Sequence, residues 1–278
     1  MTDTLVAALP QHRTRNRLLR AIPPEEFALL APHLEPVRYE IRDVLIDRDA
    51  PIQHVHFVEL GVISLVAAMA DGAAIEAATI GPEGFIGLAV TLGAQRQAWQ
   101  SFCQVPGSGL RMSAEAFREV YPRLPVLRDL LGRYTQALLT LVMQTSGCNS
   151  VHLLRERCAR WLLMTHDRVG ADTFMLTHHF LSQMLGVRRA SVTEAAGALQ
   201  AAGAIRYSHG TVHVVNRGAL EAQACECYAV IAREFSRLLE GVDRGDPLEA
   251  VRTVQDGLSM LGDGTPRGQG VPSVPDVA

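Results

Sequence analysis

The feature that most constrains the fold is a long amphipathic stretch in the middle of the chain, from Pro125 to residue 147. Its apolar residues recur at steps of three and four, which predicts a helix with one apolar face. That face comprises Leu127, Leu130, Leu131, Tyr134, Leu138, Leu141 and Val142. It packs either inside the chain or against a second copy, and a symmetric coiled-coil-like seam is the simplest second partner. We therefore expect a dimerisation helix at residues 122–147.

The residues on the two sides of this helix differ in texture. Residues 37–121 hold brief apolar runs separated by glycines such as Gly61 and Gly93, which predicts short strands in an antiparallel β-roll. The remaining segments are a helical segment at 1–36, a compact helical and β unit at 148–218, a further helix at 219–240 and a disordered tail at 241–278. The expected fold class is therefore α+β.

The composition excludes several kinds of chemistry. All 26 lysine and arginine residues are arginine, so neither a phosphate-loop lysine nor a lysine Schiff base is available. Because no nucleophile or metalloprotease motif appears either, we expect no enzyme. The chain starts without a basic and apolar leader and has no apolar stretch long enough to span a bilayer. We expect a cytoplasmic protein that makes no membrane contact.

Residues 177–200 predict two short helices joined by a glycine. Thr177 is a typical N-cap, and Gly186 can take the left-handed conformation that ends a helix. The inward faces are apolar or small, namely Phe180, Leu181, Ser182, Met184, Leu185, Val192, Ala195, Ala196 and Leu199. The second helix would expose Arg188, Arg189, Ser191 and Glu194. This is the form of a helix-turn-helix, whose second helix enters the major groove of duplex DNA.

The exposed residue types suit contacts with DNA. Arginine can bind guanine through two hydrogen bonds, serine can bind phosphate or a base, and glutamate can accept from cytosine N4. Residues 204–215 predict two strands around a turn at His209 and Gly210, which form a β-wing. Candidates for backbone contacts are Thr177, His178, His179, Arg206 and His209. Residues 151–217 contain eight arginines and four carboxylates, which gives this segment a net charge of +4. Because the whole chain has a net charge of −3, this local positive charge favours a nucleic-acid-binding module.

From about Arg17 to Arg217 these elements resemble, in the same order, the Crp/Fnr superfamily of bacterial transcription regulators. The most specific match is the segment 185–192, LGVRRASV, which resembles the family's turn and the start of its recognition helix. The resemblance implies a cyclic-nucleotide-binding-like β-roll, a homodimer formed by the long helix, a winged helix-turn-helix on a palindromic DNA site, and engagement of RNA polymerase. Arg189 matches the family's first base-reading arginine, whereas Ala190 and Glu194 replace its glutamate and second arginine, so the target site should differ from that of the cyclic-AMP receptor.

The cyclic-nucleotide cassette that the resemblance implies is degenerate here. Leu88 stands where the family has its ribose-binding glutamate, and residues 96–98 keep only part of its phosphate-binding triplet. Val142 and Met143 stand where the cyclic-AMP sensor has hydroxyl residues for adenine. We expect a small-molecule effector of unknown identity rather than cyclic AMP. The candidate effector residues are Gly87, Arg96 and Ala98.

The five cysteines are scattered, and their odd number argues against a disulfide framework. None precedes Cys103, whereas the iron–sulfur sensors of this family carry an N-terminal cysteine cluster. Haem ligation through His54, His56 or Cys103 is an alternative to ordinary packing of these residues. A second alternative is a redox or metal site formed by Cys225 and Cys227 with Cys148, Cys158 and nearby histidines. Cys-x-Cys spacing favours buried thiols instead, because structural zinc sites usually show two separated ligand pairs. We expect no metal and no cofactor.

The function that the sequence predicts is a DNA-binding transcription regulator that responds to an unidentified signal. The alternative is an effector-binding or protein-docking module whose winged helix no longer reads DNA.

Overall fold

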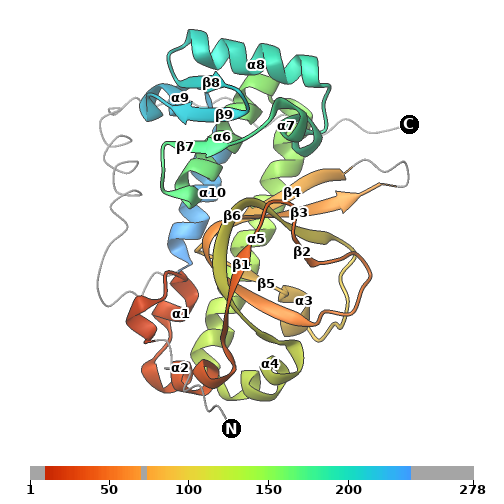
Figure 1. The fold of residues 1–278 in the computed structure, drawn as a ribbon, viewed down its shortest axis with the longest axis vertical. Coiled ribbons are helices and arrows are strands. Elements are labelled where there is room, and N and C mark those ends of the chain that lie inside the picture. The colour runs from red at the N-terminus through yellow and green to blue at the C-terminus, as the bar shows by residue number, and fades with distance from the viewer. Residues whose placement is uncertain (1–9, 70–73, 239–278) are drawn as a thin grey trace, which may run out of the picture. The chain divides into compact units, whose positions relative to one another are not determined.

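The structure, a computed structural model, describes residues 10–69 and 74–238 of the 278. Short N-terminal helices lead into an antiparallel sheet, the long helix α5 (Pro125–Val151) follows, and smaller helices surround a second sheet (Figure 1). The expected α+β class and order of elements are confirmed. The tail at 241–278 lies outside the described residues.

The N-terminal helices fasten the start of the chain to the sheet and to α5. They are η1 (Gln11–Arg13), α1 (Arg17–Ala21), α2 (Pro24–Leu30) and η2 (Ala31–His33). Asn16 caps α1, and its buried amide donates to the carbonyls of Val58 and Gly84. The buried carboxylate of Glu26 accepts from the backbone amides of Val126 and Leu127 at 2.8 and 2.9 Å. An anion at a helix N-terminus satisfies free amides and interacts favourably with the helix dipole, so Glu26 fixes where α5 begins.

The large sheet is antiparallel throughout, with the strand order β1-β6-β3-β4. Its strands are β1 (Glu35–Tyr39), β2 (Val44–Ile46), β3 (His54–Ala68), β4 (Ala74–Ile80), β5 (Phe85–Ile86) and β6 (Gln100–Ser113), and β2 and β5 pair with β6 and β3. The short helix α3 (Leu88–Thr91) lies between β5 and β6 in sequence, and α4 (Ala114–Val120) and η3 (Tyr121–Arg123) lie between β6 and α5. Ser113 caps α4 as expected, because its hydroxyl accepts from the Ala116 amide.

The pairing of β3 with β6 shifts register near Gly61, where the two backbones approach closely. Gly61 has φ +87°, and a Cβ atom there would lie 2.5 Å from the carbonyl oxygen of Val105. Opposite it, a Cβ on Gly107 would lie 2.0 Å from the Leu60 carbonyl oxygen. Both positions therefore require glycine, and the irregularity they permit bends the longest strands of the sheet.

Helix α5 buries the leucine stripe inside the chain. The stripe residues Leu127, Leu130, Leu131, Tyr134, Leu138 and Leu141 are all buried among described residues of the same chain. The Tyr134 hydroxyl donates to the Phe85 carbonyl, and its ring meets Phe235 edge to face at 6.4 Å. These six residues therefore pack within the chain, against the sheet and the C-terminal helix. Val142, the seventh residue of the predicted stripe, is 36% exposed, and the role of this helix in a dimer stays a prediction.

The C-terminal unit begins with α6 (Leu154–Val169) and contains a three-stranded sheet of order β7-β9-β8. Its other elements are β7 (Thr173–Met175), α7 (His178–Leu185), α8 (Arg189–Ala201), β8 (Ile205–Ser208), β9 (Thr211–Val214), α9 (Arg217–Gln223) and α10 (Cys227–Arg237). The single helix expected at 219–240 was wrong: Ala224 has an extended backbone with ψ 153° and separates α9 from α10.

Buried polar contacts join α6 to the large sheet. The indole nitrogen of Trp161 donates to Glu76 on β4 at 2.6 Å. Arg168 donates to Glu83, on the turn after β4, at 2.7 Å, and both side chains of this ion pair are less than a tenth exposed. Because buried charges require partners, each contact constrains how the helical unit sits on the sheet.

Candidate nucleic-acid interface

Helices α7 and α8 form the predicted helix-turn-helix, and their caps explain where each begins and ends. The Thr177 hydroxyl accepts from the Phe180 amide at 3.1 Å. Gly186 has φ +64°, and the amides of Gly186 and Val187 bond back to carbonyls of α7. This left-handed end reverses the chain into α8 within three residues, which is the short turn that a helix-turn-helix requires.

The interior of this pair is apolar, as its sequence predicts. Buried members are Leu181, Met184, Leu185, Val192, Ala195, Ala196 and Leu199, and Ser182 is buried beside them. Phe180 is only half-buried, and its ring meets that of Phe102 on β6 edge to face at 6.2 Å. The inward face of α7 thus also contacts the large sheet.

The start of α8 presents its polar side chains outward. Arg188, Arg189 and Glu194 are exposed and Ser191 is half-buried. Within the described part of the chain, Arg188, Arg189 and Arg206 form no ion pair with a carboxylate. Their charges are therefore available to an external anion, and the amino-terminal end of α8 adds to the same attraction.

Other arginines of the C-terminal unit are occupied internally. Arg168 pairs with Glu83, and Arg217 pairs with Asp167 at 2.7 Å and with Glu221 at 2.8 Å. Arg157 and Arg160 are buried. The net charge of +4 inferred from the sequence thus overstates the charge available at the surface.

The wing is a two-residue hairpin. His209 and Gly210 both have positive φ, at 48° and 77°, between the paired residues Ser208 and Thr211. Positive φ at both central residues matches the twist of a tight hairpin turn. Arg206 and His209 are exposed on it, and a Cβ on Gly210 would contact the Thr177 methyl at 3.5 Å. The wing turn therefore lies beside the cap of α7.

The adjacent histidines have different surroundings. His178 stacks on Tyr207 with ring centroids 4.1 Å apart, and its Nδ1 lies 3.0 Å from the Thr193 hydroxyl. Burial, and then the charge of Arg189, lower the pKa of His178, so its ring is neutral near pH 7. It joins α7, α8 and β8 from within the unit, a role that sequence spacing did not reveal.

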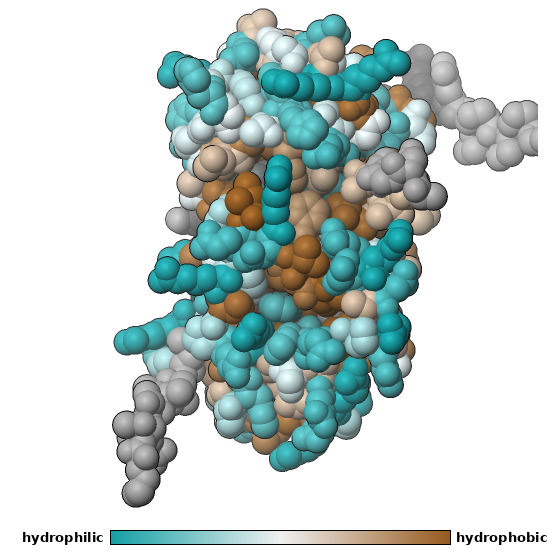
Figure 2. Space-filling view, turned by 45° about the vertical axis from the view of Figure 1, so that its right-hand side comes forward, coloured by the Kyte–Doolittle hydropathy of each residue, from teal (hydrophilic) through white to brown (hydrophobic). Residues whose placement is uncertain are grey.

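His179 is exposed and lines a groove of about 380 Å³ between α7 and the large sheet. The groove is lined by Arg42, Val44, Val66, Ala74, Gln100, Phe102, His179, Phe180, Gln183 and Met184. Apolar surface gathers in the middle of this side of the molecule, between two more hydrophilic ends (Figure 2). His179 therefore lies on the side of α7 that faces the sheet, whereas the neighbouring His178 lies against Tyr207.

The three candidate effector residues have different surroundings. Gly87 is buried, has φ +101° and directly precedes α3. A Cβ atom on Gly87 would lie 2.9 Å from the Val55 side chain. Arg96 is exposed and donates to the backbone carbonyl of Asp49, and Ala98 is exposed. None of the three lines the groove beside α7.

The other histidine and cysteine candidates fall into two groups. His56 and Cys103 are buried in the sheet, where His56 lies 3.3 Å from the Tyr39 hydroxyl and the Cys103 thiol donates to the Val105 carbonyl. Burial lowers the pKa of His56 to about 3. By contrast, Cys148, Cys225 and Cys227 meet His152 in one cluster that could hold a metal ion, and Cys158 is not part of it. His152 was not named among the residues predicted from the sequence, and together with Cys148 it supplies the second ligand pair.

Residues 156–223 match the family of Crp-like helix-turn-helix domains. Comparison of the sequence with curated proteins gives no match. Within the described residues, no helix combines the length and apolarity needed to cross a membrane.

Solved structures share the fold at low identity. FixK2 from Bradyrhizobium japonicum superimposes with a TM-score of 0.59 at 17% identity, covering 69% of this chain and 98% of its own. A putative Crp/Fnr-family regulator from Eubacterium rectale gives 0.59 at 14% identity, covering 74% and 97%. CLP of Xanthomonas campestris, a c-di-GMP-responsive global regulator, gives 0.57 at 15% identity, covering 70% and 100%.

The chain thus combines a Crp-like helix-turn-helix domain with an antiparallel sheet and a long helix that precede it in the sequence. The structural likeness shows the fold, and the family match covers the helix-turn-helix domain at residues 156–223.

Proposed function

We propose that the protein binds a palindromic duplex DNA site as a homodimer and reads bases with the first turns of α8. The observation that carries the proposal is the exposure of Arg188 and Arg189, free of carboxylate partners among the described residues, at the start of that helix. An arginine so placed can meet guanine O6 and N7 in the major groove. Glu194, also exposed, can accept from cytosine N4.

The wing and the cap of α7 supply contacts with the DNA backbone in this proposal. Arg206, His209 and Thr177 are exposed, and the wing turn lies beside Thr177. Ser191, half-buried, can reach phosphate or a base edge. His178 contributes indirectly, because its ring holds α7, α8 and β8 together. His179 is exposed, so it stays a candidate for a contact with the DNA backbone.

The second face of α5 supports the dimer. Leu139 and Met143 are 54% and 67% exposed, which is unusual for large apolar side chains. They belong to an exposed series at alternating steps of four and three, comprising Gly132, Gln136, Leu139, Met143, Ser146 and Ser150. This heptad spacing is typical of a helix that packs along an identical partner, and the small residues allow a close approach. Two helix-turn-helix units would then enter successive major grooves, about 34 Å apart.

Signal input and RNA polymerase complete the proposal. The family resemblance implies that the sheet senses an effector and that the dimer engages RNA polymerase. The effector class is left open, because Arg96, the one charged residue among the three candidates, donates to the Asp49 backbone carbonyl.

Selection of genomic fragments by the full-length protein, followed by mobility shifts at two salt concentrations, tests DNA reading. We expect an enriched palindrome whose affinity falls steeply as salt rises, because phosphate contacts release counterions. Binding with no sequence preference at either concentration would instead favour the protein-docking alternative.

The dimer is tested by Met143→Glu in analytical ultracentrifugation. A charge in an apolar seam should raise the monomer fraction. Arg128→Glu, at an exposed position of α5 outside the heptad series, is the matched control and should leave the dimer intact. An unaltered dimer in the Met143 variant would remove this face from the interface.

A further inference from the structure

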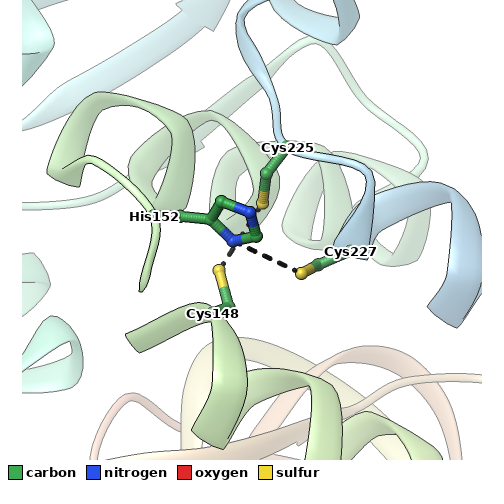
Figure 3. Close-up of side chains that lie close together, drawn as sticks. All are labelled: Cys148, His152, Cys225 and Cys227. Carbon is green, nitrogen blue, oxygen red and sulfur yellow. Dashed lines mark hydrogen bonds between the residues drawn. The ribbon is translucent and has the colours of Figure 1, made fainter. Parts of the chain in front are cut away.

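Four metal-ligating side chains converge where the end of α5 meets the joint between α9 and α10. Cys148 is in the last turn of α5 and His152 directly follows that helix. Cys225 lies two residues before the first residue of α10, which is Cys227 (Figure 3). The three cysteines are buried and the histidine is half-buried. The set therefore consists of two ligand pairs from distant parts of the sequence, the arrangement typical of structural zinc sites.

The spacing of the ligand atoms suits one metal ion. The sulfurs of Cys148 and Cys225 are 3.5 Å apart, and the Cys227 sulfur is 3.6 Å from Nδ1 of His152. No two of the four ligand atoms are more than 4.8 Å apart. Tetrahedral zinc with Zn–S bonds of about 2.3 Å places sulfurs roughly 3.8 Å apart. An iron–sulfur cluster would hold its ligands outside a larger core of iron and sulfide, so a single ion fits better.

His152 is already oriented for ligation. Its Nδ1 faces the thiols, while its Nε2 lies 3.2 Å from a carboxylate oxygen of Glu226. A metal-binding histidine usually donates its other ring N–H to a carboxylate or carbonyl, which fixes the tautomer and the ring plane. Glu226 stands between the two cysteine ligands in the sequence, so one short segment supplies two ligands and the orienting group.

The charges around the cluster point the same way. A divalent ion with three thiolates and a neutral imidazole has a net charge of −1. Arg157 and Arg160 on α6 are buried, and the Nε of each has no hydrogen-bond partner among the described residues. Buried cations of this kind require compensating negative charge, which an occupied site would supply.

We propose that Cys148, His152, Cys225 and Cys227 bind one divalent metal ion of the zinc class in tetrahedral geometry. Binding displaces the three thiol protons and leaves the imidazole neutral. The ion would tie the end of α5 to the α9–α10 joint, beside the segment that connects α5 to the helix-turn-helix unit. Its role is structural, since all four positions are filled by protein ligands.

Metal content and Co²⁺ spectroscopy of the full-length protein test this site. Reduced protein expressed with added zinc should hold one zinc ion per chain. After chelation, Co²⁺ should give the intense visible bands of tetrahedral coordination and the near-ultraviolet charge transfer of thiolate ligands, and Zn²⁺ should abolish both. Reduced protein that neither retains zinc nor gives this Co²⁺ spectrum would overturn the proposal. A Cys148–Cys225 disulfide would also overturn the proposal, if the protein binds no metal in either the oxidised or the reduced form.

Matched variants assign the ligands. Cys225→Ser and His152→Ala should lose the Co²⁺ spectrum, whereas His152→Cys should restore it with stronger charge transfer. Glu226→Gln should weaken zinc affinity by about 10- to 100-fold. Cys158→Ala is the control, because Cys158 is buried outside the cluster, and it should bind like the natural protein.

Circular dichroism of each metal-free variant separates lost ligation from lost folding. Zinc should raise the thermal midpoint of the natural protein and of the Cys158 variant, because it binds only the folded site. A folded Cys225 variant that keeps the zinc-dependent increase and the Co²⁺ spectrum would show that these residues are not the ligands.

Discussion

The helix-turn-helix unit and the antiparallel sheet differ in the surroundings of their candidate functional residues. In the helix-turn-helix, Arg188 and Arg189 are exposed and unpaired with carboxylates among the described residues. In the sheet, Arg96 is bonded to the Asp49 backbone, and Gly87 serves the start of α3. A recognition helix needs only local caps and an exposed face, whereas an effector pocket needs several segments to converge. The caps and the exposed face are present in α7 and α8, whereas Gly87, Arg96 and Ala98 lie outside the groove beside α7.

The largest effect is expected where the two halves are joined. Arg168→Ala leaves Glu83 as a buried, unpaired charge, and should lower the free energy of unfolding by about 3–5 kcal/mol. Urea denaturation measures this. The double variant Arg168→Met with Glu83→Gln removes both charges and should recover much of the loss. If the single variant costs less than about 1 kcal/mol, this pair does not hold the halves together.

The buried contact between Trp161 on α6 and Glu76 on β4 should make the free energy of unfolding depend on pH. Burial raises the pKa of Glu76 to about 7, against a usual value of 4.5. The folded state thus favours the protonated acid, and its stabilisation, full below pH 4.5, is lost as pH rises to about 7. Glu76→Gln can keep the bond from Trp161 and donate to Ser64, so it should exceed the natural protein in stability by about 3 kcal/mol at pH 8.

The pH series needs an internal comparison, because His56 acts in the opposite direction. Its lowered pKa means that acid destabilises the fold below about pH 6.5. The difference between the Glu76→Gln variant and the natural protein cancels this contribution. A difference that stays constant from pH 4.5 to pH 8 would contradict the assignment to Glu76.

A moderate effect is expected on the DNA-reading side. Arg189→Ala should weaken binding to the selected site by about 1–3 kcal/mol and relax discrimination at one base pair. Arg188→Ala is the comparison, since an arginine that contacts phosphate weakens binding uniformly across sequences. Mobility shifts on single-base variants of the site distinguish the two. Equal discrimination by the Arg189 variant and the natural protein would remove Arg189 from base reading.

The smallest effect is expected on the sheet side. Arg96→Ala removes one exposed hydrogen bond to the Asp49 carbonyl and should change the free energy of unfolding by less than about 0.5 kcal/mol. Cyclic AMP should not shift the thermal midpoint of either protein. A shift in the natural protein that disappears in the variant would mean that the sheet has kept the family's phosphate site.

The predictable features were those encoded within a few residues. Thr177, Gly186 and Ser113 act as the sequence indicates, because a cap or a left-handed turn depends on neighbours three or four positions away. The order of sheet, long helix and winged helix-turn-helix followed from periodicity and glycine spacing. The break at Ala224 was not predictable, since the apolar pattern continues through it.

The sequence by itself determined the order of the main elements and the residues that α8 exposes. Tertiary structure decided which face of α5 is covered, why His178 turns inward, and that Cys148 and His152 meet Cys225 and Cys227. These outcomes depend on packing between segments more than 70 residues apart in the case of the cysteines. Periodicity indicates that a face is buried or that a ligand type is present, but only the packed chain selects the partner.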